Sequence, residues 1–222
     1  LTIYQLPGIE FIKQFFGSYT NLCKSLGVKP IYRKGLNYQK LNQRKIQDSN
    51  ILIDTREQKP LAFPVSEIQK LDFGDYTLSG KQYNYTYVDR KSESDFKSSL
   101  TGKDGCNFNR LRRELKKAQE CDSYLYIVIE SDKNKIYRNH QFGQANHKAS
   151  LDFIYHNMRV LSHEFPNNCQ FVFSGSRENS QLLIPFLLTY GKSLWGVDIQ
   201  YYIDKQDLIS VVNQSYNINT KK

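Results

Sequence analysis

Residues 71–91 read LDFGDYTLSGKQYNYTYVDRK, and this stretch decides the fold of the chain. Apolar and polar residues alternate on both sides of SGK (79–81), which is the pattern of two strands joined by a tight turn. We therefore predict an antiparallel hairpin with strands at 71–79 and 83–91.

Candidate site residues lie on both strands of this hairpin. Successive side chains of a strand alternate between its faces, so Asp89 and Lys91 should project from one face and Arg90 from the other. Asp75 follows Gly74, a residue that permits a bend or a close approach of two chain segments. A carboxylate and an ammonium should therefore stand side by side, with a second carboxylate on the partner strand.

The run ILIDTRE (51–57) lies upstream of the hairpin. It is rich in isoleucine and ends in charged residues, and the Pro60 that follows cannot continue a central strand. We predict a buried strand that carries Asp54 at its carboxyl end. The three acids Asp54, Asp75 and Asp89 could then converge on one patch.

Downstream of the hairpin, helical and strand patterns alternate. Ser92 and Asp95 form a capping-box pattern that opens a short helix ending at Leu100. A continuously apolar run at 124–131 is typical of a central strand buried on both faces. The remaining periodicities predict helices at 107–120, 151–165 and 182–190 and a strand at 169–175. From residue 50 the order is βββ-αα-β-α-β-α, which is typical of a mixed α/β fold.

The amino-terminal part of the chain differs in character. Helical spacing at 7–27 predicts two short helices separated by a turn, and residues 28–49 are a basic stretch with little periodicity. We predict a small helical segment and basic linker at 1–47, a main domain at 48–204 and a C-terminal tail at 205–222.

Composition narrows the class of partner. The chain has 31 Lys and Arg against 22 Asp and Glu, a net charge of +9, so it should be attracted to polyanions such as nucleic acid. The alternative is that the basic residues only maintain solubility. No apolar run approaches the roughly 18 residues of a membrane span, and no signal sequence opens the chain, so we expect no membrane partner.

The four cysteines are Cys23, Cys106, Cys121 and Cys169, and they lie far apart without a C-x-x-C pair. This spacing argues against a zinc site and against a disulfide framework. We expect a reducing, intracellular location, in the cytoplasm or the nucleus or nucleoid, and not secretion. The chain opens at Leu1 rather than Met, which is compatible with a piece of a longer protein.

The grouping of acids and a lysine suits phosphodiester hydrolysis. Hard oxygen ligands hold Mg²⁺ or Mn²⁺, which polarises the phosphoryl oxygen and lowers the pKa of bound water. Asp75 and Asp89 would bind the metal, and Lys91 would orient the attacking water or the scissile phosphate. A D-x-K triplet also arises by chance, and Asp89 with Lys91 could equally form a solvated salt bridge.

Several motifs occur in a specific order: I-D-T-R-E (53–57), L-x-x-G-D-Y-x-L (71–78), V-D-R-K-S-x-x-D-F-x-x-S-L (88–100) and F-N-R-L-R-R-E-L-K-K-A (108–118). This pattern resembles the XPF-type nuclease family of the PD-(D/E)xK superfamily, closely over residues 50–131 and loosely over 150–204. The resemblance implies a restriction-endonuclease-like mixed sheet flanked by helices. It also implies metal-dependent cleavage of DNA, typically at branched or flapped structures.

The family signature, an acid after Gly and then Glu-Arg-Lys, maps onto Asp75 and onto Asp89, Arg90 and Lys91, with Asp89 where the family usually has Glu. By the same resemblance Asp95 falls on the family's trailing acid, although helix capping already explains it. The resemblance thus implies the catalytic set Asp54, Asp75, Asp89, Lys91 and Glu57, with Asp75, Asp89 and Asp54 as metal ligands.

One departure from the family affects DNA binding. Members commonly end in a double helix-hairpin-helix, for which the roughly 20 residues after Tyr202 leave no room. The basic faces at 28–45 and 110–117 are the alternative sites, and a homodimer or a protein partner stays open. The DNA-binding candidates are Arg56, Arg110, Arg113, Lys117, Arg33 and Lys34.

Three functions remain in competition. The leading one is a Mg²⁺-dependent endonuclease acting on structured or branched DNA. The second is a sequence-directed, homing-type endonuclease, because residues 17–30 faintly resemble a helical repeat attached to some homing endonucleases. The third is a catalytically silent DNA-binding module, which predicts decay of the acidic cluster, whereas Asp75, Asp89 and Lys91 are all present.

Overall fold

The structure, a computed structural model, describes residues 9–28, 35–36, 46, 48–101, 106–142 and 149–217. The chain forms two compact units, Leu1–Lys34 and Gly35–Lys222.

The first unit contains the two short helices expected from the sequence, α1 (Ile9–Phe16) and α2 (Tyr19–Ser25). The Ser18 side chain caps α2 by accepting a hydrogen bond from the Asn21 main-chain N–H at 3.2 Å. Ile12 of α1 and Leu22 of α2 are buried, and the two helices are in contact.

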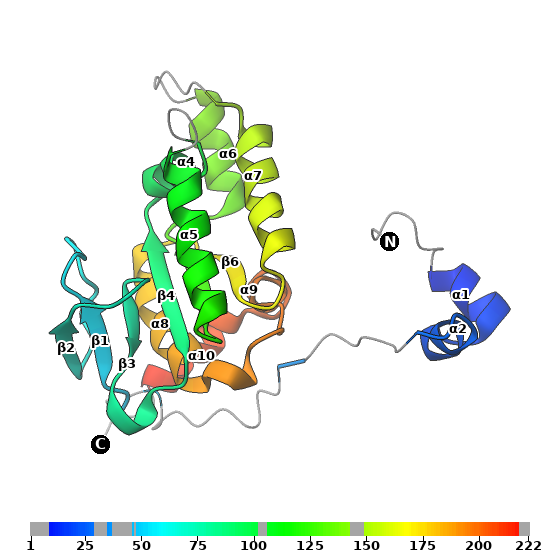
Figure 1. Ribbon diagram of the computed structural model, residues 1–222, viewed down its shortest axis with the longest axis horizontal. Coiled ribbons are helices and arrows are strands. Elements are labelled where there is room, and N and C mark those ends of the chain that lie inside the picture. Colours follow the sequence, from blue (N-terminus) through cyan, green and yellow to red (C-terminus); the bar gives the residue numbers. More distant parts are fainter. Residues whose placement is uncertain are drawn as a thin grey trace. The chain divides into compact units, whose positions relative to one another are not determined.

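The second unit is built on one six-stranded sheet, ordered β2-β1-β3-β4-β5-β6 (Figure 1). The strands are β1 (Ile51–Asp54), β2 (Ser66–Gln69), β3 (Tyr76–Leu78), β4 (Thr86–Lys91), β5 (Tyr124–Ile129) and β6 (Cys169–Phe173). The short strand β3 is antiparallel to both of its neighbours, while the other pairings are parallel. The carboxyl ends of β1, β4 and β5 and the amino end of β3 therefore meet at one edge of the sheet.

Helices cover both faces of this sheet (Figure 1). On one face an apolar core joins alternate side chains of β4 and β5 to α8 (Arg177–Tyr190), α9 (Ile199–Gln206) and α10 (Leu208–Asn217). On the other face a second core joins the intervening side chains to α4 (Glu93–Leu100), α5 (Cys106–Glu120), α6 (Lys133–Phe142) and α7 (Leu151–Glu164). The predicted fold class, a mixed sheet flanked by helices, is confirmed.

The hairpin is present, but its strands are shorter than predicted. β3 and β4 pair antiparallel, and the 3-10 helix η3 (Gly80–Gln82) lies in the connection between them. The elements β2 and α6 escaped the sequence analysis. All four residues of β2 are exposed, and α6 has a predominantly polar sequence, so neither shows a clear hydrophobic period.

Residues 205–222, predicted as a tail, contain α10, which packs against α8. Its Leu208 and Val212 are buried in the same core as α8. Among the described residues, no helix is long and apolar enough to cross a membrane. The linker predicted at 28–49 lies largely outside the described residues.

Candidate active site

Asp75 and Asp89 are brought together by main-chain pairing at the edge of the sheet. The Asp75 N–H donates to the Val88 carbonyl oxygen at 2.8 Å, and Asp75 Oδ2 accepts from the Arg90 N–H at 2.7 Å. Gly74 has a φ of +67°, and a Cβ there would lie 3.2 Å from the Val88 carbonyl oxygen. The glycine before Asp75 therefore permits the close approach of the two strands.

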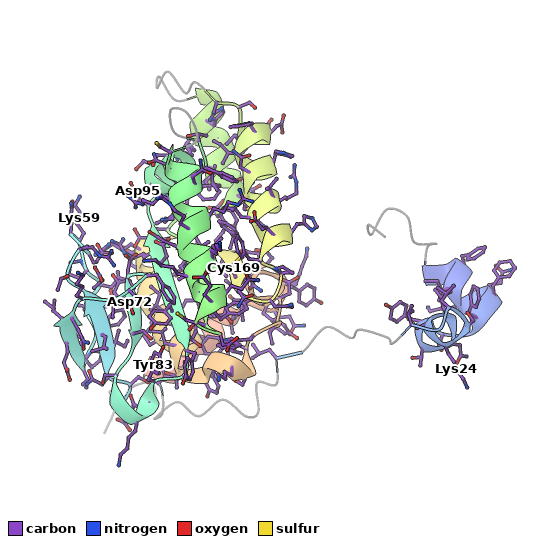
Figure 2. All side chains as sticks on the ribbon, viewed as in Figure 1. Lys24, Lys59, Asp72, Tyr83, Asp95 and Cys169 are labelled. Atoms are coloured by element: carbon purple, nitrogen blue, oxygen red, sulfur yellow. The ribbon has the colours of Figure 1, made fainter. Side chains whose placement is uncertain are left out.

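A cavity of about 1030 Å³ opens at this edge, and Asp75, Asp89 and Lys91 line it together. An adjoining cavity of about 420 Å³ has the same three residues in its wall. Figure 2 shows Lys59 and Asp95, which also line the larger cavity, near the carboxyl end of β4, with Tyr83 at the opposite end. Of the predicted site residues, the structure places six around this space: Asp75, Asp89, Lys91, Glu57, Arg56 and Arg110.

Asp89 and Lys91 form a buried ion pair on one face of β4, as strand alternation predicts. Lys91 Nζ lies 2.8 Å from Asp89 Oδ2 and donates a hydrogen bond to Oδ1 at 3.0 Å. Burial alone would lower the pKa of Lys91, but the charge of Asp89 and this hydrogen bond leave it raised. Lys91 therefore carries a positive charge inside the cavity at neutral pH.

Asp75 is held in an environment that disfavours its ionised form. Burial, followed by the negative charge of Asp89, raises the pKa of Asp75 well above its usual range. Such paired carboxylates fit a divalent cation, because Mg²⁺ takes hard oxygen ligands, commonly one or two carboxylates, and keeps several waters. No three His, Cys, Asp or Glu side chains of the described residues form a ready-made cluster of ligands, so the fit rests on this pair.

Asp54 does not line either cavity. Its Oδ1 accepts hydrogen bonds from Nε and the main-chain N–H of Arg56, both at 2.7 Å. Its Oδ2 accepts from Arg56 Nη2 at 3.0 Å and from the Leu71 N–H at 2.6 Å. Burial would raise the pKa of Asp54, but these hydrogen bonds lower it overall. The Asp54 carboxylate is therefore already engaged, and it fixes Arg56 at the rim of the cavity.

Glu57 is likewise engaged, through Arg90 on the opposite face of β4. Arg90 Nη2 lies 3.0 Å from Glu57 Oε1, and Arg90 Nη1 lies 2.8 Å from Glu130 Oε1. Arg177 of α8 also reaches Glu130 at 3.4 Å and donates to the main-chain oxygens of Lys59 and Pro60. This network holds the loop after β1 against the sheet, so it forms one wall of the cavity.

The predicted DNA-binding residues of helix α5 do not all face the active-site cavity. Arg110 lines the cavity, whereas Arg113 lines a different depression of about 710 Å³ together with Arg112 and Lys116. Lys117 is exposed on the same helix. Arg33 and Lys34 lie outside the described residues.

Glu114 of α5 is a site residue that the sequence analysis missed. It lines both cavities, and burial and the charge of Asp89 raise its pKa. The available signal was its position four residues after Arg110 within the motif at 108–118, where we considered only the basic residues. Glu130 and Arg177 were also missed, because their link to Arg90 exists only in the folded sheet.

The model of the ERCC4 domain family matches residues 42–215, which is well over half of the chain. The solved structure of XPF from Aeropyrum pernix is similar, with a TM-score of 0.42 and 17% identity over 68% of this chain and 69% of that chain. No curated protein matches the sequence. On the family match, the chain belongs to the ERCC4 domain family, the XPF-type nucleases.

Proposed function

We propose that this nuclease is a divalent-metal-dependent endodeoxyribonuclease selective for branched or flapped DNA. One observation carries the proposal: Asp75, Asp89 and Lys91 line a single cavity at the edge of the sheet. Two neighbouring carboxylates with a charged lysine beside them supply what hydrolysis of a phosphodiester requires.

Asp75 and Asp89 are the residues that would hold Mg²⁺ or Mn²⁺. The bound ion would polarise the phosphoryl oxygen and make a coordinated water a better nucleophile. We do not assign this role to Asp54, because it lines neither cavity and its carboxylate accepts four hydrogen bonds, from Arg56 and the Leu71 N–H. Asp54 is instead a positioning residue for Arg56.

Lys91 acts on the scissile phosphate. Its ammonium projects into the cavity from the same strand face as Asp89, and its raised pKa keeps it protonated at neutral pH. A fixed positive charge at this place stabilises the negative charge that develops on phosphate oxygens in the transition state. Arg56 and Arg110 stand at the rim, where they can bind phosphates that flank the cleaved bond.

The DNA substrate is supported by the net charge of +9 and by the basic residues of α5. Selectivity for branched or flapped DNA is proposed from the resemblance to XPF-type nucleases. A homodimer or a protein partner that helps to select the substrate is part of the same proposal.

The test is cleavage by the full chain of four labelled DNAs: flap, fork, nicked duplex and plain duplex, each with Mg²⁺, Mn²⁺ or a chelator. We expect metal-dependent cutting near the branch point of the flap and the fork. Asp89→Asn should abolish cutting, whereas Asp72→Asn, an exposed acid outside the cavity, should not. Defined cuts in a long plain duplex would instead favour a homing-type enzyme, and binding without any cutting would favour a silent module.

A further inference from the structure

The smaller cavity at the active site is bordered by three carboxylates. They belong to Asp75, Asp89 and Glu114, and Lys91 stands beside them. The other acids of the larger cavity have partners of their own: Glu57 and Glu130 are bound to Arg90, and Asp95 accepts a hydrogen bond from Ser92. Glu114 is therefore the acid from α5 that faces the two candidate metal ligands.

The packing of α5 fixes this orientation. Leu111 and Leu115 are buried in the same core as Ile127 and Ile129 of β5, on the sheet face that carries Asp89 and Lys91. Glu114 lies three residues after Leu111 and one before Leu115, at the border of the buried helix stripe. Its side chain is 29% exposed, which suits a group at a cavity wall and not one free in solvent.

A helix ion pair is the simpler explanation of Glu114, but its geometry is weak. Arg110 Nε lies 3.8 Å from Glu114 Oε1, and the Arg110 side chain is 72% exposed. Exposed pairs of this kind contribute little to stability and hold their partners loosely. The pair therefore leaves the Glu114 carboxylate available for a stronger ligand.

We infer that Glu114 is the third acid of the metal site, holding a water of the divalent cation that Asp75 and Asp89 bind. The inference rests on the proposed function. Contact through water fits the described residues, which contain no ready-made cluster of three acidic ligands. Mg²⁺ keeps several waters when it binds to proteins, and residues that hydrogen-bond to the coordinated groups strengthen binding.

The experiment measures binding of Mn²⁺ alone to the full chain, without DNA, by the paramagnetic resonance signal of free Mn²⁺. Glu114→Gln should weaken binding by about tenfold, the scale on which such outer residues act. Glu114→Asp keeps a carboxylate and should bind Mn²⁺ more tightly than the Gln variant. The matched control is Glu120→Gln, which removes a second i,i+4 pair of α5, with Lys116 at 3.9 Å, and should leave binding unchanged.

Thermal unfolding of each variant shows whether it is folded. If Glu114→Gln and Glu114→Asp both bind Mn²⁺ as the unchanged chain does, the inference is overturned. Asp89→Asn separates this failure from a failure of the proposed function. If Asp89→Asn loses Mn²⁺ and both Glu114 variants keep it, only the role of Glu114 is wrong. If Asp89→Asn also binds normally, the metal pair itself is wrong.

Discussion

Lys91 Nζ and Asp89 Oδ2 lie 2.8 Å apart on one face of β4, and both side chains are buried, with 10% and 7% of their surface exposed. A buried lysine keeps its charge only if a partner compensates for the lost hydration. This ion pair therefore keeps a positive charge inside the cavity next to the candidate metal ligands.

Lys91→Met should keep the shape of the side chain and remove its charge. We expect the single-turnover cleavage rate to fall by about 10²- to 10³-fold, as for loss of a transition-state donor, with Mn²⁺ still bound. Lys97→Met is the matched control, because Lys97 is also 10% exposed and pairs with Glu93 at 2.7 Å outside the cavity lining. Equal losses of cleavage rate in the two variants would mean that Lys91 contributes only to the stability of the fold.

Asp75→Asn should stabilise the metal-free protein at alkaline pH. The pKa of Asp75 is raised in the folded state by burial and by Asp89, so ionisation favours the unfolded state as pH rises above its usual value near 3.8. The variant lacks this penalty, so its Tm at pH 8 should exceed that of the unchanged chain by about 2–4 °C per ~1 kcal/mol removed. The difference should shrink as the pH falls toward this usual value and vanish below about pH 3, where the carboxyl is protonated in both states.

With Mg²⁺ bound, the unchanged chain should have a higher Tm at pH 8 than Asp75→Asn. The ion should raise the Tm of the unchanged chain at pH 8, because it binds the folded state and neutralises the paired carboxylates. It should raise the Tm of Asp75→Asn much less. Thermal unfolding with and without Mg²⁺ measures both effects, and an equal shift in both proteins would remove Asp75 from the metal site.

Asp54→Asn should damage the loop after β1 and not the metal site. The change weakens the charged hydrogen bonds to Arg56, so we expect the free energy of unfolding to fall by about 1–2 kcal/mol. The loss is limited because the Arg56 side chain is 61% exposed and solvent screens its charge. Mn²⁺ binding should stay within twofold. Asp89→Asn should instead lose Mn²⁺ binding, and loss of Mn²⁺ from Asp54→Asn would restore Asp54 as a ligand.

Arg110→Gln and Arg113→Gln should weaken DNA binding without changing the preferred structure. Each lost phosphate contact should reduce the slope of log K against log salt by about 1. Arg112→Gln is the comparison, because Glu164 already holds that guanidinium at 2.7 Å. Binding measured at several salt concentrations gives the slopes, and unchanged slopes would place the DNA away from Arg110 and Arg113.

Gly191→Ala should destabilise the second unit. Gly191 has a φ of +41°, and a Cβ there would collide with the Asn84 side chain, which donates to the Leu188 carbonyl oxygen at the end of α8. We expect the free energy of unfolding to fall by about 1–2 kcal/mol from the left-handed backbone and by about 1–3 kcal/mol from overpacking. Gly80→Ala shares the positive φ but meets nothing within 4 Å, so its Tm should fall less.

Much of the fold follows from local patterns in the sequence. Continuous apolar runs predicted β1, β5 and β6, because these strands are buried by layers on both sides. Alternation in Val88-Asp89-Arg90-Lys91 correctly placed Asp89 and Lys91 on one face and Arg90 on the other. β2 could not be found in this way, since an exposed edge strand is held by main-chain pairing with β1 and not by an apolar face.

The candidate site likewise has some features that local sequence patterns predict and others that depend on the folded structure. The sequence by itself determined that Asp75, Asp89 and Lys91 stand together, because side-chain alternation and strand pairing act over a few residues. Only the tertiary structure decided that the Leu71 N–H binds Asp54, that Arg90 pairs with Glu57, and that α5 turns Glu114 toward the cavity. These partners come from different elements, and their meeting depends on how the helices pack on the sheet, which no local period in the chain encodes.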